Sequence, residues 1–311
     1  MTNTQVTTQA SLSPEMQTYY DKKLLARLVP NFVHMQFGQK KPIPKNGGKK
    51  IQFRKFSNLA AATTPLTEGV TPAGNNLSVS EIFATVEQYG DYIEVSDVLD
   101  MTAIDPILDE STDVLGDQAS DTLDIVSREI LVSGTNVQYA NGRASRATIT
   151  ATDVLTVNEV RKAVRTMKRN KVKGINGGDF VMIVEPGATY DLQSDPKWEA
   201  AAQYAGSKQI FNGEIGRLYG VRFVETTNAK VFAGAGATGT DVYVSLMLGE
   251  NAYGVVDIAG SGSVKNIIKP HGSAGTADAL DQRATTGWKA LFTIARLEEL
   301  AVLRIEHAVS N

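Results

Sequence analysis

Apolar residues recur at helical spacing in three segments of the chain. The first segment follows Ser13 and Pro14, which are typical of a helix start, and ends before Pro30. Its apolar positions are Met16, Tyr20, Leu24 and Leu28. The second segment, residues 105–133, would span about 42 Å as a helix that rises 1.5 Å per residue. A helix of that length is unusual in a globular protein and predicts an element as long as a small domain is wide.

The predicted long helix has acidic side chains opposite its apolar positions. These side chains are Asp109, Asp113, Asp117, Asp121 and Asp124. We interpret them as keeping that face of the helix in contact with water, in preference to binding an ion.

The third helical segment opens with Thr156 and Glu159, at the spacing of a capping box. Its predicted core positions are Val157, Val160, Val164 and Met167. Its predicted outward positions are all basic, namely Arg161, Lys162, Arg165, Lys168, Arg169, Lys171 and Lys173. This is the most basic helix that the pattern predicts.

Alternation of apolar and polar residues predicts a projecting β-hairpin near the N-terminus. One strand begins at residues 51–54, and its expected partner is a single strand over residues 82–95. The connection between them, residues 59–80, is rich in Thr, Pro, Gly and Asn. A tip of that length is unfavourable in a compact monomer, so we expect the hairpin to project and to become ordered on a neighbouring molecule.

The middle and end of the chain predict a mixture of helix and strand. Short apolar strands are expected at residues 180–184, 220–225 and 242–248, with a helix around 195–205. Two further apolar runs, residues 288–294 and 301–305, are separated by Arg296 and its polar neighbours up to Glu299. They predict a hairpin of two strands that closes the fold.

The composition is that of a folded globular protein. Hydrophobic residues make up 42% of the 311 residues and charged residues 21%, which excludes wholesale disorder and coiled-coil or collagen-like composition. The chain contains no cysteine, so disulfides, thiolate metal sites and cysteine nucleophiles are excluded. No apolar run approaches the roughly 18 residues of a membrane span, and the polar N-terminal residues do not resemble a secretory signal, so we expect a soluble protein.

The small net charge of −3 conceals blocks of opposite sign. Residues 1–57 carry a local charge of +8, residues 58–135 carry −14, and the remaining residues carry +3. For each block taken alone, a face that is simply solvated is as good an interpretation as a contact surface. Because the blocks are adjacent, a second interpretation is that the basic arm lies against the acidic segment of its own chain or of another copy.

The candidate chemistry of the chain is weak. Residues 234–239 match the pattern G-x-G-x-x-G, but a strand follows the glycines where a dinucleotide site needs a helix, so we expect a loop. His34, His271 and His307 are isolated in the sequence, and we expect them to be solvated or satisfied core residues. We predict no catalytic, cofactor-binding or metal-binding residue, and no enzyme.

Three long stretches of the sequence carry a family resemblance. They are SPEMQTYYDKKLLARLVPNFVHMQFGQKKPIPKNGGKKIQFRKFSNL, VEQYGDYIEVSD and IFNGEIGRLYGVRFVETTNA. The chain resembles the major capsid proteins of tailed bacteriophages and prophages over residues 11–309. This resemblance implies an α+β fold of the Hong Kong 97 capsid type and transfers no catalytic residue.

The resemblance also implies a division of the chain. Residues 1–35 would be the N-terminal arm, and residues 36–98 the extended loop that lies on an adjacent subunit. Residues 99–173 would be the peripheral domain, with the spine helix at 105–133. Residues 174–270 would be the axial domain, and residues 271–311 the return to the peripheral domain.

The function implied is self-assembly, through pentamers and hexamers, into an icosahedral shell around double-stranded DNA, in the cytoplasm of a bacterial host. The implied partners are scaffolding and portal proteins, with decoration proteins as a further option, and DNA that is contacted weakly and without sequence specificity. The short segment before Ser11 predicts a separate scaffolding protein. The alternatives are an encapsulin-like compartment and a nicotinamide-dependent enzyme that uses the loop at 234–239.

Overall fold

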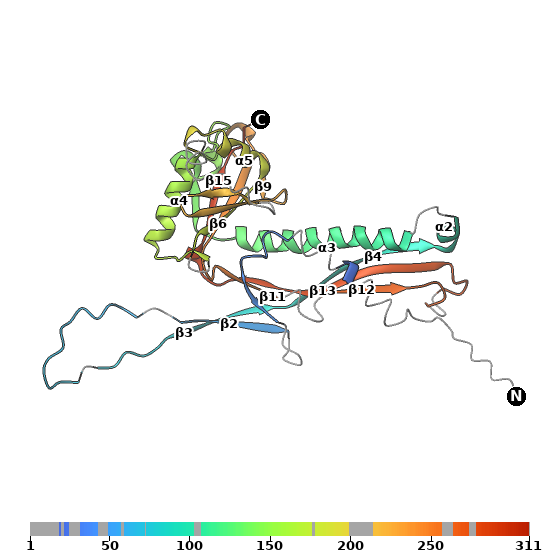
Figure 1. The fold of residues 1–311 in the computed structure, drawn as a ribbon, viewed down its shortest axis with the longest axis horizontal. Coiled ribbons are helices and arrows are strands. Elements are labelled where there is room, and N and C mark those ends of the chain that lie inside the picture. The colour runs from blue at the N-terminus through green and yellow to red at the C-terminus, as the bar shows by residue number, and fades with distance from the viewer. Residues whose placement is uncertain are drawn as a thin grey trace.

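The structure of the chain is a computed structural model, described for residues 19, 22–24, 32–42, 49–56, 59–71, 73–102, 107–175, 178–198, 214–256, 264–273 and 278–310. It consists of a long helix over an antiparallel sheet, a second body built on a mixed sheet, and a hairpin that projects far from both (Figure 1). Within these residues, no helix is long and apolar enough to cross a membrane.

Helix α3 (Ile107–Val132) lies along the sheet β12 (Val264–Lys269), β13 (Arg283–Phe292) and β4 (Glu87–Ser96), here called the helix-backed sheet (Figure 1). Alternate residues of β13 are buried towards the helix because strand side chains alternate between the two faces. They are Ala284, Thr286, Trp288, Ala290 and Phe292. Short helix α2 (Asp97–Thr102) follows β4.

The second body contains the mixed sheet. Its strands lie in the order β5 (Val137–Tyr139), β15 (Val302–His307), β10 (Val242–Leu248), β6 (Phe180–Val184), β8 (Val221–Glu225) and β7 (Glu214–Leu218), and β9 (Val231–Phe232) pairs with β10. Helices α4 (Val157–Arg169) and α5 (Pro186–Gln193) contribute buried side chains to the same core. Every residue of β6 is buried, as expected of a central strand.

A small sheet links the two bodies. Strand β1 (Gln39–Lys41) runs parallel to β11 (Tyr253–Val256), which pairs antiparallel with β14 (Ile294–Arg296). Short 3-10 turns complete the described elements: η2 (Ala140–Gly142), η3 (Arg146–Thr148), η5 (Ala237–Gly239) and η7 (Glu299–Ala301).

The predicted hairpin is confirmed. Strands β2 (Lys50–Phe56) and β3 (Val79–Thr85) pair antiparallel, and the described residues between them form an exposed, irregular tip (Figure 1). Ile51 and Phe53 are buried at the base of the hairpin, where the Phe53 ring lies against Gly254.

The prediction of one strand over residues 82–95 is wrong, because two strands meet there. The N–H of Val86 donates to the carbonyl of Lys49 at 2.7 Å, which ends the pairing of β3 with β2. Strand β4 then pairs with β13 in a different sheet. Across the break the more buried positions shift by one residue, from 82, 84 and 86 to 89, 93 and 95. Treating the segment as one continuous alternation therefore misses the change of partner.

The predicted terminal hairpin is also wrong. Strand β13 pairs with β12 and β4, whereas β15 pairs with β10 and β5 in the other body. Both segments are apolar because each is buried in its own sheet and not because they pair with each other.

Other predictions have varied outcomes. Strands β6 and β10 and the core face of α4 are confirmed. The loop at 234–239 is followed by β10, as expected. Of the first predicted helix, residues 19 and 22–24 are described and helical, and of the one at 195–205 only residues 195–198 are described. Helix α5 was not predicted, because its start at Glu185 and Pro186 carries no strong apolar period.

Candidate assembly surfaces

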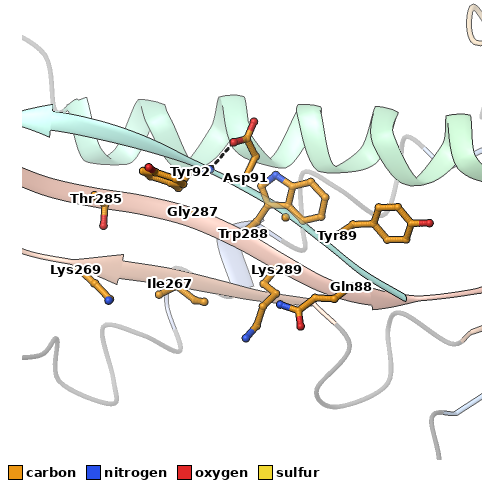
Figure 2. A pocket seen from close by; sticks show the side chains of 11 residues that line it. Gln88, Tyr89, Asp91, Tyr92, Ile267, Lys269, Thr285, Gly287, Trp288 and Lys289 are labelled. Carbon is orange, nitrogen blue, oxygen red and sulfur yellow. Dashed lines mark hydrogen bonds between the residues drawn. The ribbon is translucent and has the colours of Figure 1, made fainter. Parts of the chain in front are cut away.

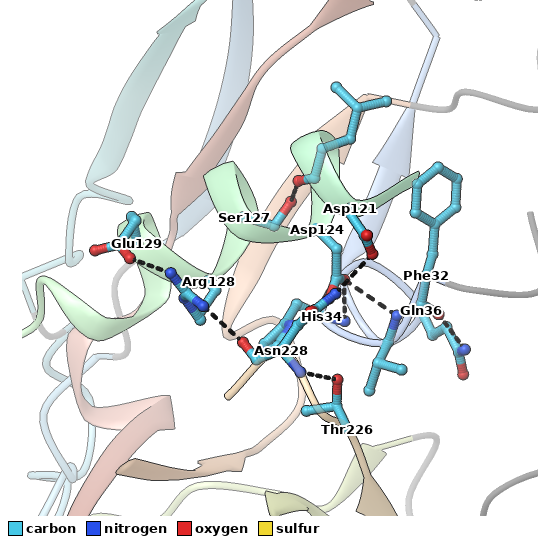
Figure 3. A network of polar contacts seen from close by, with 12 residues as sticks. Phe32, His34, Gln36, Asp121, Asp124, Ser127, Arg128, Glu129, Thr226 and Asn228 are labelled. Carbon is cyan, nitrogen blue, oxygen red and sulfur yellow. Dashed lines mark hydrogen bonds and ion pairs between the residues drawn. The ribbon is translucent and has the colours of Figure 1, made fainter. Parts of the chain in front are cut away.

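Residues 32–38, here called the arm segment, are anchored to helix α3 by a buried carboxylate (Figure 3). Asp124 Oδ1 accepts hydrogen bonds from the backbone N–H groups of Val33 at 3.1 Å and of His34 at 2.8 Å. Asp124 Oδ2 lies 2.8 Å from His34 Nδ1. The Asp124 side chain is fully buried and that of His34 is 1% exposed, so these three contacts replace the hydration that the carboxylate would have in water.

The interpretation of Asp124 as a solvent-facing acid is therefore wrong. The arm segment covers this side of the helix, and the helical period alone does not show what packs there. His34 is a satisfied core residue, as predicted, but its carboxylate partner is 90 residues away in the sequence.

Tyr253 secures the same arm segment from the other side. Its hydroxyl donates to the carbonyl of His34 at 2.5 Å and accepts from the N–H of Phe37 at 3.1 Å. Burial raises the pKa of the Tyr253 phenol far above its ordinary value. A Cβ at Gly38 would overlap the Tyr253 ring, so only glycine permits this close approach.

The acidic face of α3 is largely engaged within the chain. Asp113 lies 3.5 Å from Lys23 Nζ, and Asp121 accepts from Asn228 at 3.1 Å. Glu129 pairs with Lys230 and Arg128; although partial burial raises its pKa, their hydrogen bonds lower it below the ordinary value. The contact between Lys23 and Asp113 confirms that the basic arm meets the acidic segment of its own chain.

The hairpin has an outer face on which the described residues leave two aromatic rings uncovered, one on each side of an ion pair between Arg54 and Glu81. In the strand register, Phe83 lies opposite Gln52, Arg54 opposite Glu81, and Phe56 opposite Val79 on this face. Phe56 and Phe83 are 59% and 58% exposed. Further exposed apolar residues follow in the tip, namely Leu59, Leu66, Val70 and Leu77. Exposed apolar residues gathered on one element mark a surface for another protein.

A groove of about 620 Å³ lies on the helix-backed sheet. Figure 2 shows Lys269, Lys289 and Ile267 directed away from helix α3, with Trp288 on the opposite side of the sheet. Gly90 and Gly287 form its floor, where a Cβ would come within 2.5 Å of the Trp288 carbonyl oxygen and 2.7 Å of the Tyr92 Cβ respectively. The far face of this sheet is therefore grooved, basic and open to solvent.

A second hollow of about 720 Å³ lies at the base of the hairpin. Phe56 and Arg54 of the hairpin face Lys171 and Lys173 of the second body across it. An ion pair between Lys55 and Glu298 holds the hairpin base beside this hollow.

The other two histidines contact side chains of the same chain. His307 is fully buried, its Nε2 lies 2.9 Å from Ser245 Oγ, and burial lowers its pKa to about 4. His271 Nε2 lies 3.6 Å from an Asp100 carboxylate oxygen. In the part of the chain that the structure describes, no group of three or more His, Asp or Glu side chains could hold a metal ion.

The chain thus combines a long helix on an antiparallel sheet, a mixed α and β body and a projecting hairpin with exposed apolar side chains. A sequence model described as phage capsid protein matches residues 107–271, more than half of the chain. The chain belongs to this phage capsid protein family, and it is a major capsid protein with a structural role in the virion.

Solved structures show the same α+β fold. The capsid of Ralstonia phage GP4 superposes with a TM-score of 0.70 at 15% identity, over 89% of this chain and 86% of that chain. The Cyanophage Pam1 capsid asymmetric unit gives a TM-score of 0.67 at 14% identity, over 92% of each chain. A virus-like particle from Pyrococcus furiosus gives 0.54 at 11% identity, over 94% of this chain and 99% of that chain. The search of curated proteins finds no match.

Proposed function

We propose that the chain closes into an icosahedral shell around double-stranded DNA and that the hairpin of each copy lies on an adjacent copy. The observation that carries this proposal is the pair of exposed rings on the outer face of β2 and β3, Phe56 and Phe83, together with the exposed apolar residues of the tip. Burial of apolar surface stabilises association by about 25 cal/mol per Å² before the costs of ordering are subtracted. Repetition over many copies strengthens a contact that is modest in one pair.

We propose a domain division that is based on sheet membership. We assign α3, β4, β12 and β13 to the peripheral domain and the mixed sheet with α4 and α5 to the axial domain. This division differs from the sequence ranges, since β5 and α4 precede residue 174 and β15 follows residue 270, yet all three pack in the mixed-sheet body. Strand β12, within 174–270, pairs with β13 in the other body.

The proposed partners of the chain are those of a shell protein that packages DNA. Scaffolding and portal proteins would direct closure in the cytoplasm of the bacterial host, and no reaction is assigned to the chain. DNA inside the shell is contacted weakly, because gripping by many cations would oppose packaging and ejection.

Electron microscopy of particles from cells that express the chain with its neighbouring phage genes tests the proposal. Closed shells that contain nuclease-protected DNA support it, and soluble monomers alone contradict it. Shells that enclose a cargo protein and no DNA favour the encapsulin-like alternative. A variant in which residues 60–77 are replaced by a two-residue turn should fold but form no shells.

A further inference from the structure

Helix α4 presents a row of cations to solvent. Arg161, Arg165, Lys168 and Arg169 are all exposed and are spaced four, three and one residues apart, which places them on one side of the helix. The row is about 12 Å long at 1.5 Å per residue. Figure 1 shows α4 on the flank of the mixed-sheet body, away from helix α3.

Three of these four cations have no polar partner among the residues that the structure describes. Lys162, on the neighbouring edge of the helix, pairs with Glu159 at 2.7 Å. No ion pair or hydrogen bond joins the side chain of Arg165, Lys168 or Arg169 to another residue that the structure describes. Four cations side by side repel each other, so an anionic partner would relieve that repulsion.

An exposed aromatic ring lies beside the row. The guanidinium of Arg161 is 5.4 Å from the centre of the Tyr219 ring, and Tyr219 is 48% exposed. Tyr219 and Gly220 form the two-residue turn between β7 and β8, with φ of 53° and 76°. A tyrosine is strained in this left-handed conformation, where asparagine is preferred, so the turn displays the ring at the expense of local stability.

The acids of a second copy do not match this row. Four carboxylates of α3 already have partners within the chain, and these partners are Lys23, Asn228, His34 and Lys230. The exposed acids of β4 and α2 also have contacts within the chain, because Glu94 pairs with Arg283 and Asp91 accepts from Gln118. Asp100 of α2 lies beside His271. Glu68 in the hairpin tip, Glu110 on α3 and Glu250 after β10 are further exposed acids, and they lie on separate elements. The partner is therefore sought outside the chain.

We propose that Arg161, Arg165, Lys168, Arg169 and Tyr219 form a contact surface for the phosphate backbone of duplex DNA. Duplex DNA offers one negative charge per roughly 1.7 Å of its axis, so a row of this length faces several phosphates at once. The proposed contact is with phosphates alone, which position a protein on the duplex but carry no sequence information. This inference rests on the proposed function, because it takes the enclosed DNA as the ligand.

Fluorescence anisotropy of a labelled 30-base-pair duplex with the full-length unassembled chain, from 50 to 200 mM salt, tests the proposal. In Arg165→Ala/Lys168→Ala/Arg169→Ala, we expect binding at 50 mM salt to weaken at least tenfold. The slope of log K against log salt should fall by about 2.7, at about 0.9 for each phosphate that the variant no longer neutralises. The matched control is Lys265→Ala/Lys269→Ala/Lys289→Ala, which removes the same charge from the helix-backed sheet and should keep the slope.

A second variant, Tyr219→Asn, relieves the strained turn and removes the ring. We expect it to fold at least as well as the wild type and to bind the duplex several-fold more weakly. Equal losses of affinity in the α4 and control variants, or no loss in either, would overturn the assignment to α4.

Assembled particles separate this inference from the proposed function. If the α4 variant fails to form shells while its DNA affinity is unchanged, the partner is a second copy and the inference is wrong. If wild-type shells contain no DNA, the proposed function fails. If shells package DNA but the α4 substitutions change neither slope nor affinity, only the inference fails.

Discussion

His34 and Asp124 join the incoming arm segment to helix α3 through a buried contact. Removing one partner of such a pair leaves the other without its hydrogen bonds in a place that water does not reach. The anchor sets where the chain enters β1 and the hairpin, so it bears on assembly as well as on stability.

We expect Asp124→Ala to lower the free energy of unfolding by about 3–5 kcal/mol, because His34 and two backbone N–H groups are left without their acceptor. Urea denaturation of the unassembled chain measures this decrease. Asp121→Ala, one turn earlier and exposed, serves as the control and should cost under about 1 kcal/mol. Similar decreases for the two variants would contradict the role of the anchor.

His307 gives the stability of the chain a pH dependence of known sign. Burial lowers its pKa from 6.5 to about 4, so between these values the unfolded chain binds more protons than the folded one. Stability is fully present above pH 6.5 and decreases as the pH falls towards 4, by on the order of 3 kcal/mol from this group.

The measurement is Tm at pH 7 and pH 5 for the wild type and for His307→Gln, whose amide can still meet Ser245. The Tm of the variant should fall less on acidification than that of the wild type. An unchanged difference would show that other groups account for the acid sensitivity.

At the scale of elements, the hairpin is formed by local pairing but its outer face has no use within the described chain. Phe56 and Phe83 are more exposed than not, so changing them affects the fold little and a neighbour contact strongly.

We expect Phe56→Ser/Phe83→Ser to leave the unfolding free energy within about 1 kcal/mol of the wild type and to reduce the yield of closed shells severalfold. Light scattering and electron microscopy check the yield, and urea denaturation checks the fold. Lys49→Ser/Lys50→Ser at the base of the same hairpin is the control. Normal shell yield in the aromatic variant would contradict the proposed role of this face.

Helices and strands could be predicted from the sequence where buried positions repeat regularly along the whole element. The core face of α4, strand β6 and strand β10 could be predicted because each has one continuous environment along its length. The boundary between β3 and β4 is marked in the sequence only by a one-residue shift of the alternation after Val86, and such a shift does not say which strand each half pairs with.

At the scale of the whole molecule, charge is distributed so that the arm and the acidic helix meet within one chain while α4 and the helix-backed sheet remain basic. Contacts between copies that use the remaining charges are screened by salt, whereas the apolar hairpin contact is not.

We therefore expect assembly to weaken as salt rises from 0.05 to about 1 M if charge pairs between copies contribute. Light-scattering yields over this range measure the effect, with the Phe56→Ser/Phe83→Ser variant as the comparison. Unchanged wild-type yields would show that apolar contacts alone hold the shell.

The sequence by itself determined the long helix, helix α4, the central strands, the charge blocks and the resemblance to capsid proteins, because periodicity and composition act over neighbouring residues. The tertiary structure alone decided that Asp124 is buried against His34, that β13 and β15 lie in different sheets, and that Tyr219 meets Arg161. These contacts join residues far apart in the chain, and they depend on which surfaces pack together, which no local pattern encodes.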